Sequence, residues 1–361
     1  MMQIIAWIGV SQAIFAAILM LSKKENNVSD KVLFFWLVLL TFDFFTCGLD
    51  YELFQKPLLS SSFLLFNPAL YLYIRSLTNK NFKLNFFQFL HFIPYLAFKV
   101  LSYILKEPFS MNTFFNVDEN LIYRMMFGTA TTISCVVYSI LSLRIVHIHR
   151  MKLQNEHSNI DENDNITWVL FVSIFYVVYC IVAFIIALLA YFTSSYPLSP
   201  HFYNYSVLLF LIYILSFYGL YQHRLSPIAL AQDHNKIPYQ NSSLSNDLKQ
   251  QIKVKIEQLI VHEKLYLDSN LNMDMLSNKL KIPKYQITEV LNTVIGQNFF
   301  QYVNYHRVEA VKEMLSNKKN LYSIEAIGYE CGFSSKSSFY TVFKNLTGKT
   351  PVAYRNTIKT D

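Results

Sequence analysis

The chain has 361 residues, of which 53% are apolar and only 15% are charged, and its mean hydropathy is +0.26. A soluble domain usually carries about a quarter charged residues, so this composition excludes a purely soluble protein. Charge is also divided unevenly, because residues 1–221 hold 13 Lys and Arg against 12 Asp and Glu, whereas residues 222–361 hold 18 against 12. The sequence therefore predicts an apolar part of net charge +1 followed by a basic, more polar part of net charge +6.

The first 221 residues carry the signals of a membrane domain. A helix needs about 20 apolar residues to cross a bilayer core of about 30 Å. Asn67 and Pro68 interrupt the third candidate stretch, and His91 and Pro94 the fourth, but packed neighbouring helices tolerate such residues. The apolar run that starts at Met1 has no basic residues before it, so we expect a true span and not a cleaved signal. We predict an all-α fold with a seven-helix transmembrane bundle over residues 1–222, with spans near 3–22, 32–53, 60–77, 85–105, 121–146, 167–192 and 203–222.

The Lys and Arg residues of the short loops predict which face of the bundle is cytoplasmic, because such loops are retained there during insertion. Four of them lie toward one face, namely Lys56, Lys99, Lys106 and Arg124. Nine lie toward the other face, namely Lys23, Lys24, Lys31, Arg75, Lys80, Lys83, Arg144, Arg150 and Lys152. We therefore expect a multi-pass protein surrounded by the lipid of a bacterial inner (cytoplasmic) membrane, with an extracytoplasmic N-terminus and a cytoplasmic C-terminal domain.

The membrane part shows no pattern of a catalytic site. It contains no HExxH, no GxSxG, no glycine-rich phosphate loop, and no carboxylate pair at helical spacing within one span. His147 and His149 lie beside Arg150 at the expected membrane edge, which favours a solvated interfacial face over a metal site. We predict that the protein is not an enzyme and holds no cofactor and no metal.

Asp43 stands near the middle of the second span, where an ionisable group is costly in hydrocarbon and normally faces the bundle interior. Asn67 lies at a similar depth in the third span. Two interpretations of these residues stay open. The favoured one is a structural hydrogen bond between two helices, and the other is a site that senses an unknown small-molecule or membrane signal.

Residues 223–247 turn polar and contain Pro227 and Pro238, which predicts a tether. In residues 248–270, Ile252, Ile256 and Ile260 form an apolar side among lysines and glutamates. This spacing predicts an amphipathic connecting helix that packs on its own domain, with pairing to a partner chain as the alternative.

Residues 271–361 repeat one layout twice. In the first copy Asn272 caps a short helix that a tight turn at Lys281 joins to a second helix, and in the second copy Ser323 is the cap and Gly332 supplies the turn. The expected helices cover 273–280, 284–295, 298–316, 324–331 and 336–346, with a short terminal helix from 351 to 355. We therefore predict two helix-turn-helix units separated by a long helix.

The stretch from Ser323 to Arg355, SIEAIGYECGFSSKSSFYTVFKNLTGKTPVAYR, resembles the signature of the AraC/XylS family of bacterial transcription regulators, and residues 271–322 resemble the first half of the same domain. The resemblance implies sequence-specific binding of double-stranded DNA, with the two recognition helices in successive major-groove faces about 34 Å apart. It also implies RNA polymerase as a partner, while a homodimer is left open. The whole arrangement is similar to membrane-embedded regulators of this family in Bacteroidetes-type bacteria.

The apolar positions of each unit predict which side of its second helix faces outward. Ile287, Val290 and Leu291 point inward in the first unit, as do Phe339 and Phe343 in the second. The residues expected to face bases or phosphates are Lys284, Tyr285, Gln286, Thr288 and Glu289 in the first unit and Lys336, Ser337, Ser338, Tyr340, Thr341 and Lys344 in the second.

Three features of the domain bear on how it meets DNA. Family members often carry Arg near the position of Glu289, and a carboxylate there repels phosphate but can accept a hydrogen bond from cytosine. Lys281 replaces the usual turn glycine. Lys318 and Lys319, between the two units, either touch the phosphate backbone or form a solvated loop.

The sequence thus predicts a membrane-embedded, sequence-specific transcription regulator whose membrane half is an anchor and a sensor. One alternative is a transporter or channel whose tail regulates it, although such a protein should place several polar or broken helices at the midplane. The other is a receptor whose cytoplasmic tail docks protein instead of DNA.

Overall fold

The computed structural model describes residues 1–23, 27–59, 62–79, 81–110, 113–160, 166–192, 200–222, 244–317 and 321–360. Every named element in these ranges is a helix, and the only β pairing there is two isolated bridges, which confirms the all-α prediction. The chain divides into two compact units, one of Met1–His147 with Ile166–Leu225 and one of Ile148–Asn165 with Ser226–Asp361. The polar segment 223–243 and the pair Lys318 and Lys319 lie outside the described residues.

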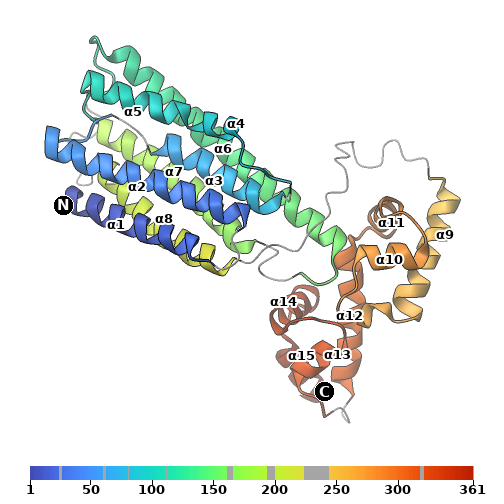
Figure 1. Ribbon diagram of the computed structural model, residues 1–361. Helices are drawn as coiled ribbons and strands as arrows, with labels where there is room; N and C mark the ends of the chain where they lie inside the picture. The colour runs from blue at the N-terminus through green and yellow to red at the C-terminus, as the bar shows by residue number, and fades with distance from the viewer. Residues whose placement is uncertain are drawn as a thin grey trace. The chain divides into compact units, whose positions relative to one another are not determined.

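The first unit is a bundle of apolar helices in which α1, α2 and α8 pack side by side (Figure 1). Within the described residues, six helical stretches are long and apolar enough to cross a membrane. The helices are α1 (Met2–Leu21), α2 (Val28–Phe54), α3 (Phe63–Thr78), α4 (Phe86–Phe89), the 3-10 turn η1 (Leu90–Phe92), α5 (Ile93–Leu105), α6 (Leu121–Glu156), α7 (Thr167–Phe192) and α8 (Pro200–Tyr221).

The third predicted span differs from the other six. It forms α3, which has 16 residues and is therefore about 24 Å long, shorter than the hydrocarbon core. Pro68 lies inside this helix and is buried. The fourth predicted span has the required length only as α4, η1 and α5 together, and Pro94 stands in the first turn of α5, where proline needs no amide partner.

Small residues let α1 and α2 approach closely. Ala6, Gly9 and Ala13 are buried on α1, and a Cβ atom built on Gly9 would lie 2.1 Å from the ring of Phe44 on α2. Close backbone approach through small residues is how helices associate in lipid, where apolar side chains gain nothing by leaving the solvent. Other apolar side chains remain exposed on this unit, among them Ile104, Ile133, Ile140, Phe171 and Phe184, so lipid is their natural cover.

Helix α6 continues ten residues beyond its predicted end at 146. It has 36 residues, about 54 Å of helix, which exceeds the length that a bilayer core requires. Its last residues, Ile148–Glu156, belong to the second compact unit, together with the segment that follows. The membrane domain was predicted to hold all of 1–222, so this exchange of residues 148–165 is the main departure from the expected division.

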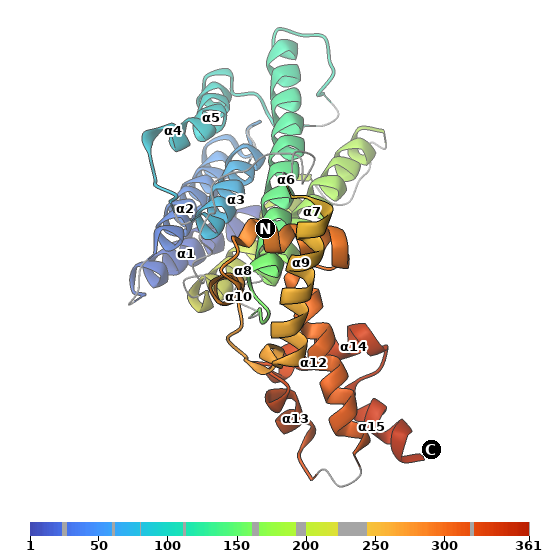
Figure 2. The same cartoon turned by 90° about the vertical axis from the view of Figure 1, so that its right-hand side faces the viewer.

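The second unit carries the predicted pair of helix-turn-helix motifs, with α13, α14 and α15 packed on α12 (Figures 1 and 2). Its helices are α9 (Asn246–Glu257) with the π turn η2 (Gln258–His262), the 3-10 turn η3 (Leu265–Leu267), α10 (Met273–Leu280), α11 (Lys284–Val290) with the π turn η4 (Leu291–Ile295), α12 (Phe299–Ser316), α13 (Ile324–Glu330), α14 (Lys336–Thr347) and α15 (Pro351–Thr360).

The predicted helix starts of this unit are confirmed by their caps. The side chains of Asn272, Asn298, Ser323 and Ser335 each accept a hydrogen bond from a backbone amide of the first turn. The predicted connecting helix is shorter than 248–270, because α9 and its π turn end at His262. Its apolar side is buried in its own domain, as expected.

Two hydrophobic cores form, and α12 contributes to both. Phe299, Tyr302 and Val303 pack with the first helix-turn-helix unit and α9, whereas Val308 and Val311, one to two turns later, pack with the second unit. The second core contains Phe339 and Phe343, as predicted, together with Ile324, Ile327, Cys331, Phe333 and Val342. One continuous helix therefore joins the two motifs.

The first prediction concerns the second core. Phe343 is fully buried, so Phe343→Ala should destabilise this unit by about 3–5 kcal/mol, the range for a truncated buried aromatic. Amide hydrogen exchange of the full-length protein should lose protection in α13 and α14 first. Lys344→Ala, an exposed neighbour on the same helix, is the matched control and should leave protection unchanged. Equal protection in both variants would show that Phe343 does not hold this core.

Candidate nucleic-acid interface

The second helix of the first motif, α11, presents a polar face at its start. Lys284 is its first residue, the Tyr285 side chain is 64% exposed, and Gln286 and Thr288 are half-buried. Ile287 points inward, as predicted, so these four residues share the outer side of the helix. The Gln286 amide lies 3.2 Å from the Tyr285 hydroxyl and can donate to it, which joins two of the expected base-facing side chains.

The prediction that Glu289 faces the groove is wrong. Its side chain is only 3% exposed, and its Oε1 lies 2.8 Å from the Lys249 Nζ of α9. Glu289 precedes the buried Val290 in the helix, on the side that α9 covers, and α9 supplies the cation that makes burial of the carboxylate tolerable. The negative charge is therefore neutralised inside the domain, and it neither repels phosphate nor reads cytosine from α11.

The second motif presents α14 in the same way. Lys336 is the first residue of the helix, and Ser337, Thr341 and Lys344 are exposed. Ser338 and Tyr340 are half-buried, and the Ser338 amide donates to the side chain of Ser335 that caps the helix. The residues predicted to face DNA are thus accessible on one helix, whose opposite side, with Phe339 and Phe343, closes the core.

A carboxylate holds the first lysine of each of these helices. The Lys336 Nζ lies 2.8 Å from Glu325 Oε1 and 5.6 Å from the centre of the Tyr340 ring. The Lys284 Nζ lies 2.7 Å from Asp274 Oδ1. Asp274 and Glu325 are each the second residue of the first helix in their motif, so the two motifs repeat this ion pair as well as their fold.

These pairs keep both lysines charged. The hydrogen bond from Lys336 lowers the pKa of Glu325, and the same contact raises the pKa of Lys336. Partial burial opposes the charge of Lys284, but its hydrogen bonds to Asp274 and Glu156 outweigh that effect and raise its pKa. Both ammonium groups are therefore charged at neutral pH.

The region where the two motifs meet, called the seam below, is held together by Arg307 and Ser158, which the sequence did not predict as functional residues. Arg307 of α12 is fully buried, with its Nε 2.7 Å from the Tyr266 carbonyl oxygen and an Nη2 2.8 Å from that of Asp268. The Ser158 carbonyl oxygen lies 3.1 Å from Nη1, and the Ser158 hydroxyl oxygen lies 3.0 Å from Nη2. Burial lowers the pKa of Arg307 to about 9, which still leaves the guanidinium charged at neutral pH.

Gly332 shows how tightly this seam is closed. Its φ of +92° is a left-handed value that favours glycine, and a Cβ there would lie 2.5 Å from the Tyr266 carbonyl oxygen and 2.9 Å from Arg307 Nε. The prediction of a turn residue at Gly332 is confirmed, with close packing as a second reason for glycine. The sequence signal for Arg307 was its place between Val303 and Val308, among the buried positions of a long helix.

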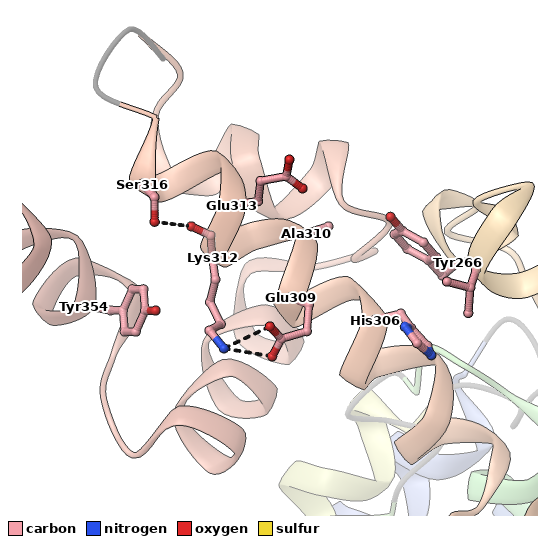
Figure 3. A pocket seen from close by; sticks show the side chains of 9 residues that line it. Tyr266, His306, Glu309, Ala310, Lys312, Glu313, Ser316 and Tyr354 are labelled. Atoms are coloured by element: carbon pink, nitrogen blue, oxygen red, sulfur yellow. Dashed lines mark hydrogen bonds and ion pairs between the residues drawn. The ribbon is translucent and has the colours of Figure 1, made fainter. Parts of the chain in front are cut away.

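A cavity of about 480 Å³ lies on another side of α12 (Figure 3). Glu309 and Lys312, which line it, pair with each other at 2.8 Å, and His306 stacks against the Tyr266 ring. Four of the titratable groups that line this cavity are thus engaged in pairs. Among the described residues, no three His, Cys, Asp or Glu side chains cluster closely enough to hold a metal.

In the first unit, Asp43 and Asn67 have separate partners. Asp43 Oδ1 accepts a hydrogen bond from the Tyr95 hydroxyl of α5 at 2.7 Å. Asn67 donates to the Ser134 hydroxyl of α6 at 2.9 Å and accepts from the Tyr176 hydroxyl of α7. Each residue therefore ties its helix to another one. Asp43 Oδ2 is buried and has no hydrogen-bond donor among the described residues.

A family model and a similar protein agree with the helix-turn-helix geometry of the second unit. Residues 276–357 match a family model described as a helix-turn-helix domain. An uncharacterized HTH-type transcriptional regulator in the cgkA 5' region of Pseudoalteromonas carrageenovora is 27% identical over 128 residues, which are 34% of this chain and 74% of that protein. A solved structure of a protein of unknown function from Listeria innocua is 25% identical over 30% of this chain and 94% of that chain, with a TM-score of 0.26.

The second prediction separates phosphate contacts from base contacts on α14. If Lys344 meets a phosphate, Lys344→Ala in the full-length protein should weaken DNA binding and reduce the slope of log Kd against log salt by about one unit. If Lys336 and Thr341 read bases, their alanine variants should instead flatten the preference among sequences, by about 1–3 kcal/mol for a good bidentate contact.

Lys253→Ala is the charge-matched control for this experiment, because Lys253 lies on α9 and pairs with Glu257 at 3.7 Å. Its salt slope should stay that of the native protein. Identical slopes and sequence preferences in all four variants would remove α14 from the interface.

Proposed function

We propose that the protein is a membrane-anchored, sequence-specific DNA-binding regulator of transcription, with its helix-turn-helix domain in the cytoplasm of a bacterial cell. The observation that carries this proposal is the repeated motif. Two helices, α11 and α14, begin with a lysine and carry polar side chains on their outer sides, and the continuous helix α12 contributes to the cores of both motifs. The match of residues 276–357 to a helix-turn-helix family and the similarity to a transcriptional regulator support the same conclusion.

The membrane part of the proposal is supported by six stretches of membrane-spanning length and by their exposed apolar side chains. The segment from Ile148 onward, which follows the fifth predicted span, packs with the helix-turn-helix domain. This packing supports a location of both on one side of the membrane. The loop charges favour the cytoplasm for the loop after this span, and chromosomal DNA is found there.

We propose no catalytic step, because helix-turn-helix regulators act by binding and no catalytic pattern is present in the sequence. In the role proposed here, the two recognition helices would enter successive major grooves, and RNA polymerase would be the partner of the bound protein. A tail that docks protein is the rival function, and salt-dependent retention on DNA separates the two.

The third prediction tests location and function together. Reporter fusions after Lys83 and Arg224 should report the cytoplasm, and a fusion after Lys106 should report the opposite side. Chromatin capture of the tagged full-length protein should recover defined promoter regions from cells in which the protein fractionates with the membrane. An extracytoplasmic reporter signal after Arg224 would contradict both the topology and DNA binding.

The fourth prediction concerns sensing in the first unit. We propose that Asp43, whose Oδ2 is buried without a donor among the described residues, forms a sensor site with the nearby groups of α5. Asn67 belongs to the same proposed sensor through its hydrogen bonds to α6 and α7. Asp43→Asn keeps the size of the side chain and should alter signal-dependent transcription at unchanged protein abundance. Asp118→Asn, in the loop before α6, is the control and should leave signal-dependent transcription unchanged.

If Asp43→Asn instead lowers the amount of protein in the membrane and leaves regulation per molecule unaltered, the residue is structural. That result would agree with the hydrogen bond to Tyr95 as its whole role.

A further inference from the structure

The two motifs differ in one respect at their first lysine. Both lysines pair with a carboxylate of the preceding helix in their own motif, Asp274 for Lys284 and Glu325 for Lys336. Lys284 has a second carboxylate, because Glu156 Oε2 lies 2.9 Å from its Nζ. Glu156 is the last residue of α6, so this extra charge comes from the helix that begins in the membrane bundle.

The chain just after Glu156 is anchored in the seam between the two motifs. Ser158 is fully buried, its hydroxyl donates to the Leu271 carbonyl oxygen at 2.5 Å, and its own carbonyl oxygen accepts from Asn304 Nδ2 at 2.8 Å. Two of the five hydrogen bonds of Arg307 also end on Ser158. Ser158 is therefore held inside the domain by several buried hydrogen bonds and does not merely touch its surface.

Asn159 connects the motifs to each other. Its Nδ2 donates to the Ser269 carbonyl oxygen, next to the first motif, at 2.7 Å, and to the Gly332 carbonyl oxygen in the turn of the second motif at 2.9 Å. In the last turn of α6, Gln154 Oε1 accepts a hydrogen bond at 3.2 Å from the Nδ2 of Asn298, the residue that caps α12. The end of α6 thus touches both motifs and the helix between them.

We propose that residues Gln154–Asn159, which are the end of α6 and the three residues after it, form an intramolecular regulatory element that docks in the seam between the motifs and uses Glu156 to withhold Lys284 from DNA. The inference rests on the DNA-binding function proposed above. Ser158 and Asn159 are the anchor, and Glu156 is the group that acts. A phosphate must displace two carboxylates to reach Lys284 but only one to reach Lys336, so the first motif is the regulated one.

A signal that withdraws the end of α6 removes Glu156 and the anchor together. Lys284 then keeps only its pair with Asp274, and the first recognition helix becomes equivalent to the second. Coupling of this kind is reciprocal, so DNA that engages Lys284 also favours release of the segment.

The test measures DNA binding by the full-length protein in lipid nanodiscs, with a mixed-sequence duplex long enough for two adjacent major-groove sites, over a range of salt. Glu156→Gln should tighten binding by about two- to fivefold, the range for a partly exposed ion pair. The salt slope should become steeper by about one unit, because one more lysine meets a phosphate.

Asn159→Leu tests the anchor. It removes both hydrogen bonds at similar size and leaves Glu156 and Lys284 in place, so it should tighten binding by releasing the segment. The double variant should bind DNA little more tightly than either single variant, because both changes remove the same carboxylate, that of Glu156, from Lys284. Independently, DNA added to the native protein should increase amide exchange in residues 154–159.

Glu313→Gln is the matched control, since it removes a carboxylate of the same domain at the cavity beside α12 (Figure 3). If Glu313→Gln and Glu156→Gln tighten DNA binding equally, the effect comes from the net charge of the domain, and the proposal is overturned. So would weaker DNA binding by Asn159→Leu together with a lowered Tm, which is the signature of a purely structural clip. If the native protein retains no duplex at any salt, the proposed function itself fails, which is a different result.

Discussion

The second unit is organised around a buried arginine whose five hydrogen bonds to the described residues end on carbonyl, hydroxyl and amide oxygens and not on a carboxylate. Arg307 has five N–H groups, and five acceptors meet them: the carbonyl oxygens of Tyr266, Asp268 and Ser158, the Ser158 hydroxyl and the Asn304 side chain. A buried donor left without an acceptor costs about 1–3 kcal/mol, and more when it is charged. Three distant stretches of chain must therefore meet at one side chain. Their meeting places the two helix-turn-helix motifs on α12 and brings the end of α6 into the same unit.

The ion pairs of Lys284 and Lys336 contribute much less free energy than specific DNA binding does, so they can be broken when DNA binds. A partly exposed pair contributes about 0.2–1 kcal/mol, whereas specific DNA binding at Kd values of about 10⁻⁸–10⁻¹¹ M involves more than ten times as much free energy. Asp274 and Glu325 can hold the two lysines in position and still yield to a phosphate. The buried pair of Glu289 and Lys249 does something else, because it lies inside the domain and joins α9 to the first motif.

The sequence predicted the elements that depend on local signals. Caps such as Asn272 and Ser335, and the apolar spacing of Phe339 and Phe343, act within one or two turns and can be read without knowing what lies across the core. It failed where a distant partner decides. The spacing of α11 alone assigns Glu289 to the groove, because it does not show that α9 covers this side of the helix. Hydropathy predicts an end of α6 at 146, whereas helical hydrogen bonding continues to Glu156. Ser158 and Asn159 lie in a polar loop, and only the arginine across the seam gives them a role.

The continuity of α6 explains why Glu156, at the end of this helix, is suited to the regulatory role proposed above. After Gly128 the helix has neither glycine nor proline up to Glu156, so nothing in its sequence interrupts the backbone hydrogen bonds that keep a helix stiff. Residues 223–243, the other connection between the two units, lie outside the described residues. In the regulation proposed above, a change in the first unit would therefore reach Lys284 through α6, because a continuous helix carries a shift along its axis to its last residue, Glu156.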